Sequence, residues 1–174
     1  MVLKDRSLLI MLTAVLAVLL QGCGLKISYS TTGASISADV KTLSVQVFQN
    51  RASLVQPGLN QKLTDALIDQ CRAQTNLTIV SSGGDVSFDG DITDYRTQPL
   101  TVSGNEQAAM NRFSITVRVK FVNNVDPELS FEQPFTRYLD YSSSQNLSDV
   151  EVPLAEEIVK MLVEDIFNRA FVNW

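Results

Sequence analysis

Histidine is missing from this chain of 174 residues. It is the side chain most often used as a general base near neutral pH and the most common metal-binding side chain. Its absence excludes Ser-His and Cys-His catalytic arrangements and every metal site that uses imidazole. The acidic residues around Gly90 lack the spacing of a calcium-binding loop. We therefore expect no enzymatic activity, no catalytic residues, no metal site and no cofactor.

Cysteine is scarce, since the chain has only Cys23 and Cys71. Cys71 falls on the apolar stripe of a predicted helix, where a free cysteine behaves as a small hydrophobic residue. If Cys23 is chemically modified, as its setting indicates below, Cys71 has no disulfide partner in the chain. The folded protein must then be stabilised by its apolar core.

Apolar runs long enough to cross a membrane are also missing. The longest mainly apolar stretch is residues 8–20, which is shorter than the roughly 20 residues that a spanning helix needs. It follows Lys4 and Arg6, so a charged segment precedes an apolar one, as in an export signal. We predict that residues 1–22 are a signal peptide and that the mature protein works outside the cytoplasm.

The end of this stretch, LQGC at 20–23, resembles the bacterial lipobox, with a branched apolar residue three places before the cysteine and a small residue just before it. The resemblance implies that Cys23 is diacylated on sulfur, cut free of Gly22 and acylated on its new amine, for example with palmitate. The alternative is an ordinary secretory cleavage that leaves a free thiol. Two or more acyl chains hold a protein stably on a bilayer. Residues 23–40 are then a lipidated N-terminal tether, and residues 41–174 form a single domain.

Basic residues are outnumbered, because 14 Lys and Arg face 19 Asp and Glu for a formal net charge of −5. Nucleic acids and anionic lipid surfaces attract proteins of the opposite charge. The charge therefore argues against both as general partners.

Apolar periodicity is the strongest pattern that the chain does have. Alternating apolar and polar residues predict strands at 43–47, at 77–92 with a turn at 81–84, at 113–121 and at 129–141. Apolar stripes predict helices over 59–71 and 148–171. The expected fold is α+β, a four-stranded mixed β-sheet with two α-helices packed on one face in the order β-α-β-β-β-α. The first strand and the next should be parallel, since a helix connects them, and the later ones antiparallel.

The last helix carries an unusually wide apolar surface. Its apolar positions cover an arc of roughly 240°, whereas packing on one sheet face needs a stripe nearer 100°. We predict that the surplus, with Phe167, Phe171 and Trp174 near the end of the chain, faces a partner protein.

Two basic residues, Arg118 and Lys120, fall on the polar side of the strand at 113–121. A basic row on an exposed sheet face, which Arg112 or Arg137 could join, is suited to an anionic glycolipid headgroup. The alternative is pairing with acidic residues across strands, Asp89 or Asp91.

Five segments together resemble the LptE family, specifically its Bacteroidetes branch. They are CG at 23–24, YSTTGASI at 29–36, VFQNRA at 47–52, GDITDY at 90–95 and VEDIFNRAF at 163–171. The resemblance implies a lipoprotein of the cell outer membrane, anchored by Cys23, with its domain on the periplasmic side or inside a barrel lumen. It also implies a role as plug and assembly partner of the LptD β-barrel in lipopolysaccharide transport. No catalytic residues carry over, and lipopolysaccharide contact by Arg118 and Lys120 is a hypothesis.

Two other classes of function stay open. A free-standing envelope lipoprotein that binds a small ligand or glycan would need a concave cavity with convergent polar groups. An accessory protein would instead need an exposed surface that fits another protein. An enzyme that works through pairs of Asp or Glu would need a cleft, for which the sequence gives no signal.

Overall fold

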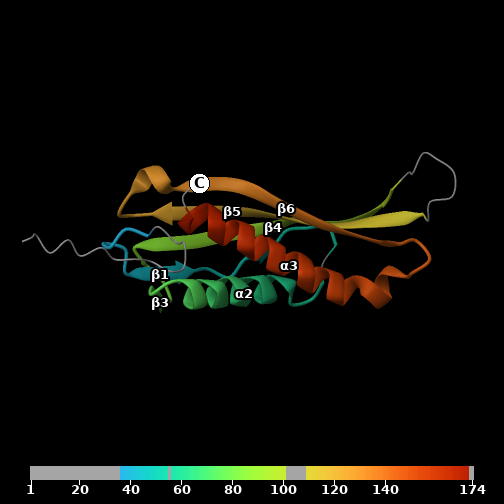
Figure 1. The fold of residues 1–174 in the computed structure, drawn as a ribbon, viewed down its shortest axis with the longest axis horizontal. Helices are drawn as coiled ribbons and strands as arrows, with labels where there is room; N and C mark the ends of the chain where they lie inside the picture. Colours follow the sequence, from blue (N-terminus) through green and yellow to red (C-terminus); the bar gives the residue numbers. More distant parts are fainter. Residues whose placement is uncertain (1–35, 55, 101–108, 173–174) are drawn as a thin grey trace, which may run out of the picture. The chain divides into compact units, whose positions relative to one another are not determined.

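The computed structural model describes residues 36–54, 56–100 and 109–172, which form one mixed β-sheet with two helices on one face (Figure 1). The elements are, in chain order, β1 (Thr42–Val45), β2 (Gln49–Asn50), α2 (Leu59–Gln74), β3 (Thr78–Val80), β4 (Val86–Leu100), β5 (Met110–Asn123), the short 3-10 helix η1 (Pro127–Leu129), β6 (Phe131–Ser142) and α3 (Leu147–Phe171). The predicted α+β class and both predicted helices are confirmed.

The prediction of four strands is wrong, because the sheet has six. Their order is β3-β1-β4-β5-β6, and β2 pairs with β4. The predicted strand at 77–92 is two strands, since the turn at 81–84 sends β3 and β4 to opposite edges of β1. Strand β2 has two residues, too few for any alternation to appear.

The predicted strand directions are confirmed. Strand β1 pairs in parallel with both β3 and β4, and β4, β5 and β6 form an antiparallel meander. Pro134 lies in β6, which is an edge strand of the sheet. An edge tolerates proline because no neighbour needs its missing N–H.

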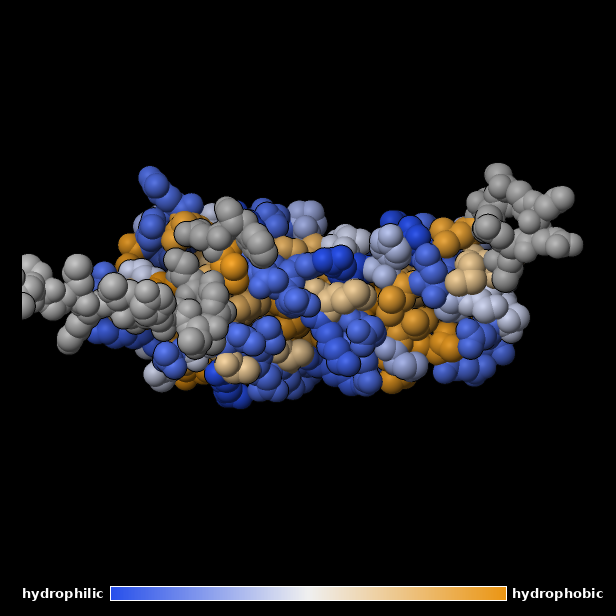
Figure 2. Space-filling view, in the orientation of Figure 1, coloured by the Kyte–Doolittle hydropathy of each residue, from blue (hydrophilic) through white to orange (hydrophobic). Residues whose placement is uncertain are grey.

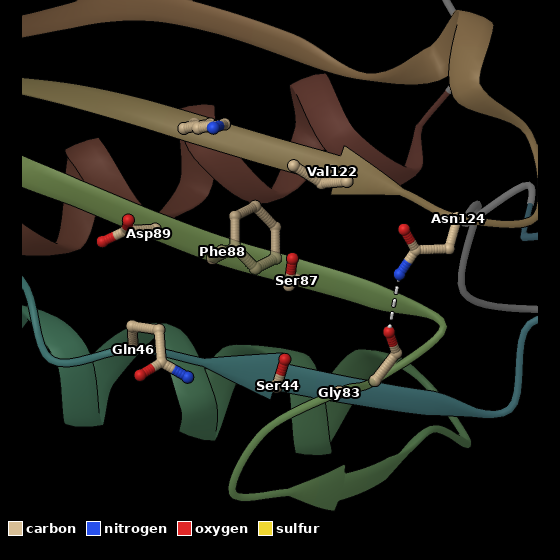
Figure 3. Close-up of a pocket in the computed structure, with 10 residues that line it drawn as sticks. Ser44, Gln46, Gly83, Ser87, Phe88, Asp89, Val122 and Asn124 are labelled. Atoms are coloured by element: carbon tan, nitrogen blue, oxygen red, sulfur yellow. Dashed lines mark hydrogen bonds between the residues drawn. The ribbon is translucent and has the colours of Figure 1, made fainter.

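Strand β5 at the centre of the meander supplies one complete row of the core. Its buried apolar side chains are Phe113, Ile115, Val117, Val119 and Phe121. Because side chains alternate along a strand, the residues between them point to the other face. Figure 3 shows that other face with both helices behind the strands, so α2 and α3 cover only the apolar side of the sheet.

Helix α3 packs against β5 and β6 and also against α2. Its buried residues are Ala155, Ile158, Val159, Leu162, Val163, Ile166, Phe167 and Phe171. Contact with a sheet and with a second helix occupies more of the helix circumference than one sheet face would. The wide apolar arc is therefore used inside the fold.

The prediction that Phe167 and Phe171 face a partner is consequently wrong. Phe171 is 4% exposed, and its ring lies edge-on to Phe88 and Phe121 at centroid distances of 5.9 and 5.7 Å. Phe167 is also buried, and Trp174 lies outside the described residues. Figure 2, viewed from the side of the helices, shows hydrophobic residues in separate places among hydrophilic ones. Among the large apolar residues that are exposed in the described part of the chain, α3 contributes Val152 alone.

Tyr95 connects β4 to the first turns of α3. It is 5% exposed, its ring is edge-on to Phe113 at 4.8 Å, and its hydroxyl donates a hydrogen bond to Glu151. Burial, together with the nearby Glu151 carboxylate, raises the pKa of Tyr95 above its usual value. We expect Tyr95→Phe to lower the free energy of unfolding by about 1.5–3 kcal/mol, because it removes a hydrogen bond to a charged acceptor. Denaturant titration followed by circular dichroism measures the change.

Tyr138→Phe is the control, since Tyr138 is 49% exposed. Its loss should stay within about 0.5 kcal/mol. The raised pKa means that Tyr95 contributes stability below pH 10, its ordinary pKa, and that this stability is lost as the pH rises further. Equal alkaline sensitivity of wild type and Tyr95→Phe would contradict this role.

Candidate binding face of the sheet

The face of the sheet that the helices leave open is polar. The pairing register places alternate residues of three strands on it. They include Ser87, Asp89 and Asp91 from β4, Arg112, Ser114, Thr116, Arg118 and Lys120 from β5, and Glu132, Pro134, Thr136, Tyr138 and Asp140 from β6. This face is where the predicted basic pair lies.

Arg118 and Lys120 are both exposed near the middle of the sheet. Arg118 is paired in register with Asp91, and Lys120 with Asp89, as the cross-strand alternative predicts. Asp91, however, forms its ion pair with Arg51, at 2.7 Å between Nε and Oδ1. Within the described ranges neither Arg118 nor Lys120 has an ion-pair partner within 4.0 Å. Both cations are therefore available to an external anion.

Arg112 and Arg137 do not extend this basic pair. Arg112 makes two hydrogen bonds to Asp140, of 2.8 and 2.9 Å, and its guanidinium lies 3.7 Å from the ring centroid of Tyr138. The hydrogen bonds lower the pKa of Asp140 and raise that of Arg112. Arg137 lies on the helix side, where it binds Asp165 of α3 at 2.5 and 2.6 Å. Arg137 therefore connects the edge strand to the helix layer.

Two hollows lie side by side on the open face. The β1 hollow, of about 260 Å³, is lined by Ser44, Gln46, Gly83, Gly84, Ser87, Phe88, Asp89, Lys120, Val122 and Asn124 (Figure 3). The Arg118 hollow, of about 240 Å³, is lined by Gln49, Arg51, Asp89, Gly90, Asp91, Arg118, Lys120 and Glu132. Asp89 and Lys120 border both. Each hollow is smaller than the roughly 300 Å³ at which pockets for drug-sized ligands begin.

The β1 hollow arises from the short pairing between β1 and β4. The two strands pair only from Leu43 to Val45, and the chain rejoins β4 at Gln49. Sequence reasoning missed Ser44, Ser87 and Asn124, because each looks like an ordinary outward-facing polar residue. The turn signal at 81–84 was visible, but it did not say that β1 would lie beside β4.

Asp85 fixes one end of this hollow. Its Oδ2 accepts hydrogen bonds from the backbone N–H of Lys41 and Thr42, each at 2.9 Å, and from the Thr42 hydroxyl at 2.8 Å. The backbone N–H of Asn124 also donates to the Asp85 carbonyl oxygen at 2.9 Å. Asp85 thereby ties the start of β1 to β4 and to the end of β5.

The hydrogen bonds from Lys41 and Thr42 lower the pKa of Asp85 from its ordinary 3.8. A lowered folded-state pKa contributes stability above pH 3.8 that is lost as the pH falls below it. We expect Asp85→Asn to unfold at lower denaturant than wild type at pH 7, with the difference shrinking towards pH 2. Asp39→Asn, an exposed carboxylate nearby, is the control. A difference that stays constant from pH 7 to pH 2 would contradict the assignment.

An apolar groove of about 220 Å³ lies between the two helices. It is lined by Gln56, Leu59, Lys62, Ala66, Ala155, Glu156, Val159 and Lys160. The Lys62 amine reaches across it to Glu156 at 2.8 Å. The groove is thus part of the contact between the helices.

The two cysteines and the end of the predicted tether lie away from the open face or outside the described residues. Cys71 is fully buried, and burial raises the pKa of its thiol to about 12, so it stays protonated and unreactive at neutral pH. Cys23 lies outside the described residues, whereas Val40, at the end of the predicted tether, is part of the core. Across the described ranges no three Cys, Asp or Glu side chains are placed to hold a metal ion. No helix there is both long and apolar enough to cross a membrane.

Comparison with known proteins identifies one family and several similar folds. The family described as LptE, Lipopolysaccharide-assembly, matches residues 40–170. No curated protein matches the chain. A hypothetical protein from Chlamydia trachomatis has a TM-score of 0.52 at 7% identity, covering 77% of this chain and 99% of its own, and it supports the fold alone.

Two lipoproteins of known structure are also similar. The minor lipoprotein from Acinetobacter baumannii has a TM-score of 0.49 at 14% identity, covering 75% of this chain and 91% of its own. The rare lipoprotein B from Shewanella oneidensis has a TM-score of 0.47 at 11% identity, covering 74% and 90%.

Proposed function

The chain belongs to the LptE lipopolysaccharide-assembly family, and from that premise we propose that it is an outer-membrane lipoprotein that acts as plug and assembly partner of an LptD-like β-barrel. Its task there is transport of lipopolysaccharide to the outer leaflet. The observation that carries the proposal is the family match over residues 40–170, which includes every strand described above, α2, and all of α3 except Phe171. The family is one of envelope lipoproteins without enzymatic activity.

The two faces of the sheet support the role of a plug. The large β-barrels of outer membranes have polar, water-filled interiors. A domain that stands in such an interior needs a polar exterior, and the open sheet face of this chain is polar along β4, β5 and β6. Since Phe167 and Phe171 are buried, we assign the barrel contact to this polar face and not to the end of α3.

The anchor in this proposal is Cys23, lipidated as its lipobox predicts. The test is affinity purification of the full-length lipoprotein from native envelopes, followed by identification of what accompanies it. We expect an LptD-like barrel to be retained. Recovery of the lipoprotein without any barrel would reject the role of a plug.

Arg118 and Lys120 are the residues that we propose contact the phosphate groups of lipopolysaccharide. Reversing both charges, Arg118→Glu with Lys120→Glu, should weaken lipopolysaccharide capture by about tenfold or more, because each charge-assisted hydrogen bond contributes about 1.5–3 kcal/mol. A pull-down with the purified full-length protein and lipopolysaccharide measures the loss.

A matched control keeps the net charge change identical. Arg72→Glu with Lys160→Glu reverses two exposed cations on α2 and α3, away from the open face. If this control weakens lipopolysaccharide capture as much as the double variant on β5, capture depends on the net charge of the protein. The assignment of Arg118 and Lys120 as contact residues would then be dropped.

A further inference from the structure

The β1 hollow is lined by hydroxyl and amide groups that can form further hydrogen bonds. Ser44 is 1% exposed and lines the hollow, yet no hydrogen bond to its hydroxyl is formed by the residues that the structure describes. Ser87 is its register partner on β4, and Figure 3 shows the two hydroxyl oxygens on the same side of the neighbouring strands. A hydroxyl that lines a hollow can both donate a hydrogen bond to a polar ligand and accept one from it.

The amide side chains of the hollow, Gln46 and Asn124, each form a hydrogen bond through nitrogen. Gln46 donates from Nε2 to the Ser81 carbonyl oxygen at 3.2 Å, and Asn124 donates from Nδ2 to the Gly84 carbonyl oxygen at 3.0 Å. These bonds fix the two amides, and their oxygens accept no hydrogen bond from the described residues. Asp89 accepts one bond, at Oδ1 from the Gly90 N–H at 2.8 Å, which leaves Oδ2 as a further acceptor.

This mixture of groups selects a class of ligand. A free anion would meet Asp89 and a free cation would meet Lys120, which are register partners at the edge of the hollow. An apolar group would leave the hydroxyls and amide oxygens unpaired. A neutral polyhydroxylated ring both donates and accepts at each hydroxyl, so it satisfies serines, amide oxygens and carboxylate together.

We propose that the β1 hollow binds a single sugar residue of a saccharide. The physiological source that we assign rests on the proposed function: the sugar belongs to the glycolipid whose anionic group reaches Arg118 in the adjoining hollow. Lys120 and Asp89, which border both hollows, then contact the ligand between its sugar and its anionic group. Among the described residues that line the β1 hollow, Phe88 is the one aromatic residue, and it is fully buried and offers no ring for stacking. Affinity for an isolated saccharide should therefore be weak, on the order of millimolar.

Saturation-transfer difference NMR tests this inference, because it detects weak binding through the resonances of the sugar. The protein is the full chain in a detergent without sugar headgroups, and the probe is a deacylated and dephosphorylated core oligosaccharide from lipopolysaccharide. Ser87→Ile fills the hollow from the outward side of β4. Its matched control is Thr116→Ile, on the same face of β5 and outside both hollows.

We expect transfer to the oligosaccharide from wild type and from Thr116→Ile, and at least a fivefold smaller transfer from Ser87→Ile. Gln46→Ala is a second variant, which removes the amide oxygen, together with the hydrogen bond to Ser81, without adding bulk. Gln46 is exposed, so we expect the fold to be kept and transfer to fall again. Equal transfer from Ser87→Ile and wild type would place the sugar elsewhere and overturn the inference. No transfer from wild type to either the core oligosaccharide or maltotriose would also overturn it.

Two further comparisons identify the source of the sugar and distinguish failure of the sugar site from failure of the proposed function. Transfer to maltotriose but not to the core oligosaccharide would keep the sugar site and replace the glycolipid by a free saccharide as its source. If the protein captures a barrel but shows no saccharide transfer, the sugar site is rejected and the role of a plug is kept. Saccharide transfer without barrel capture would reject the plug and leave the hollow as a sugar site.

Discussion

Replacing Phe171 by alanine is expected to lower the free energy of unfolding by about 3–5 kcal/mol, the range for removing a buried aromatic side chain. Its ring contacts three others, those of Phe88, Phe121 and Phe167, with centroid distances of 5.9, 5.7 and 5.2 Å. These rings come from β4, β5 and α3, so the truncation opens a cavity where helix and sheet meet. Denaturant titration of the full-length protein without a partner measures the effect.

Val152→Ala is the control for Phe171, since Val152 lies on the same helix and is 47% exposed. It should change the free energy of unfolding by no more than about 0.5 kcal/mol. If Phe171→Ala were equally harmless to the isolated protein but prevented capture of a barrel, Phe171 would be an interface residue after all.

Replacing Gly90 by alanine is expected to destabilise the protein by about 3 kcal/mol or more, beyond the usual effect of an added methyl group in a core. A Cβ on Gly90 would overlap the carbonyl oxygen of Arg118 and lie 2.8 Å from Cε1 of Phe48. The Phe48 ring could turn aside, but the backbone of β5 is held by its pairing with β4 and β6. Relief would require β4 and β5 to separate, so the denaturant midpoint should fall sharply.

Gln98→Ala serves as the control, because Gln98 is an exposed residue of the same strand. It should leave the midpoint nearly unchanged. A midpoint of Gly90→Ala equal to that of wild type would show that the strands are not as close at Gly90 as described. The same variant should also disturb the Arg118 hollow, whose lining includes Gly90.

Local periodicity was sufficient for the elements whose residues repeat many times. Strand β5 alternates from Phe113 to Phe121, and α3 repeats its apolar positions over 25 residues, so both could be predicted from sequence. Strand β3 was predicted only as the start of one strand region at 77–92, and β2, with two residues, was not predicted. The places of both in the sheet are defined by what they pair with. Pairing is a property of the tertiary structure, which a window of sequence does not contain.

The error over α3 has a different cause. The width of an apolar arc reports how much of a helix is buried, but not which neighbours bury it. The sequence reasoning allowed one neighbour, the sheet, and assigned the surplus to a partner, whereas α2 covers part of it. The salt bridge between Lys62 and Glu156 joins the same two helices at their surface.

The candidate site was partly predictable. Arg118 and Lys120 alternate with buried residues of β5, so their side of the sheet followed from the pattern. Arg137 alternates in step with Phe135 and Leu139, so all three lie on the same face of β6. That pattern could have placed Arg137 on the helix side. The β1 hollow could not be derived in this way, because its walls come from strands that are distant in sequence.

The place of β1 between β3 and β4 has a consequence for the order in which the protein folds. Strands β4, β5 and β6 are consecutive in the chain and can zip together as neighbours, whereas Thr42 meets Asp85 across 43 residues. Closing a longer loop costs more entropy before any contact compensates it, and nonlocal pairings form more slowly. We therefore expect the meander to form first and β1 to insert late. The polar wall that Ser44 contributes is then completed only when the N-terminal part of the domain docks last.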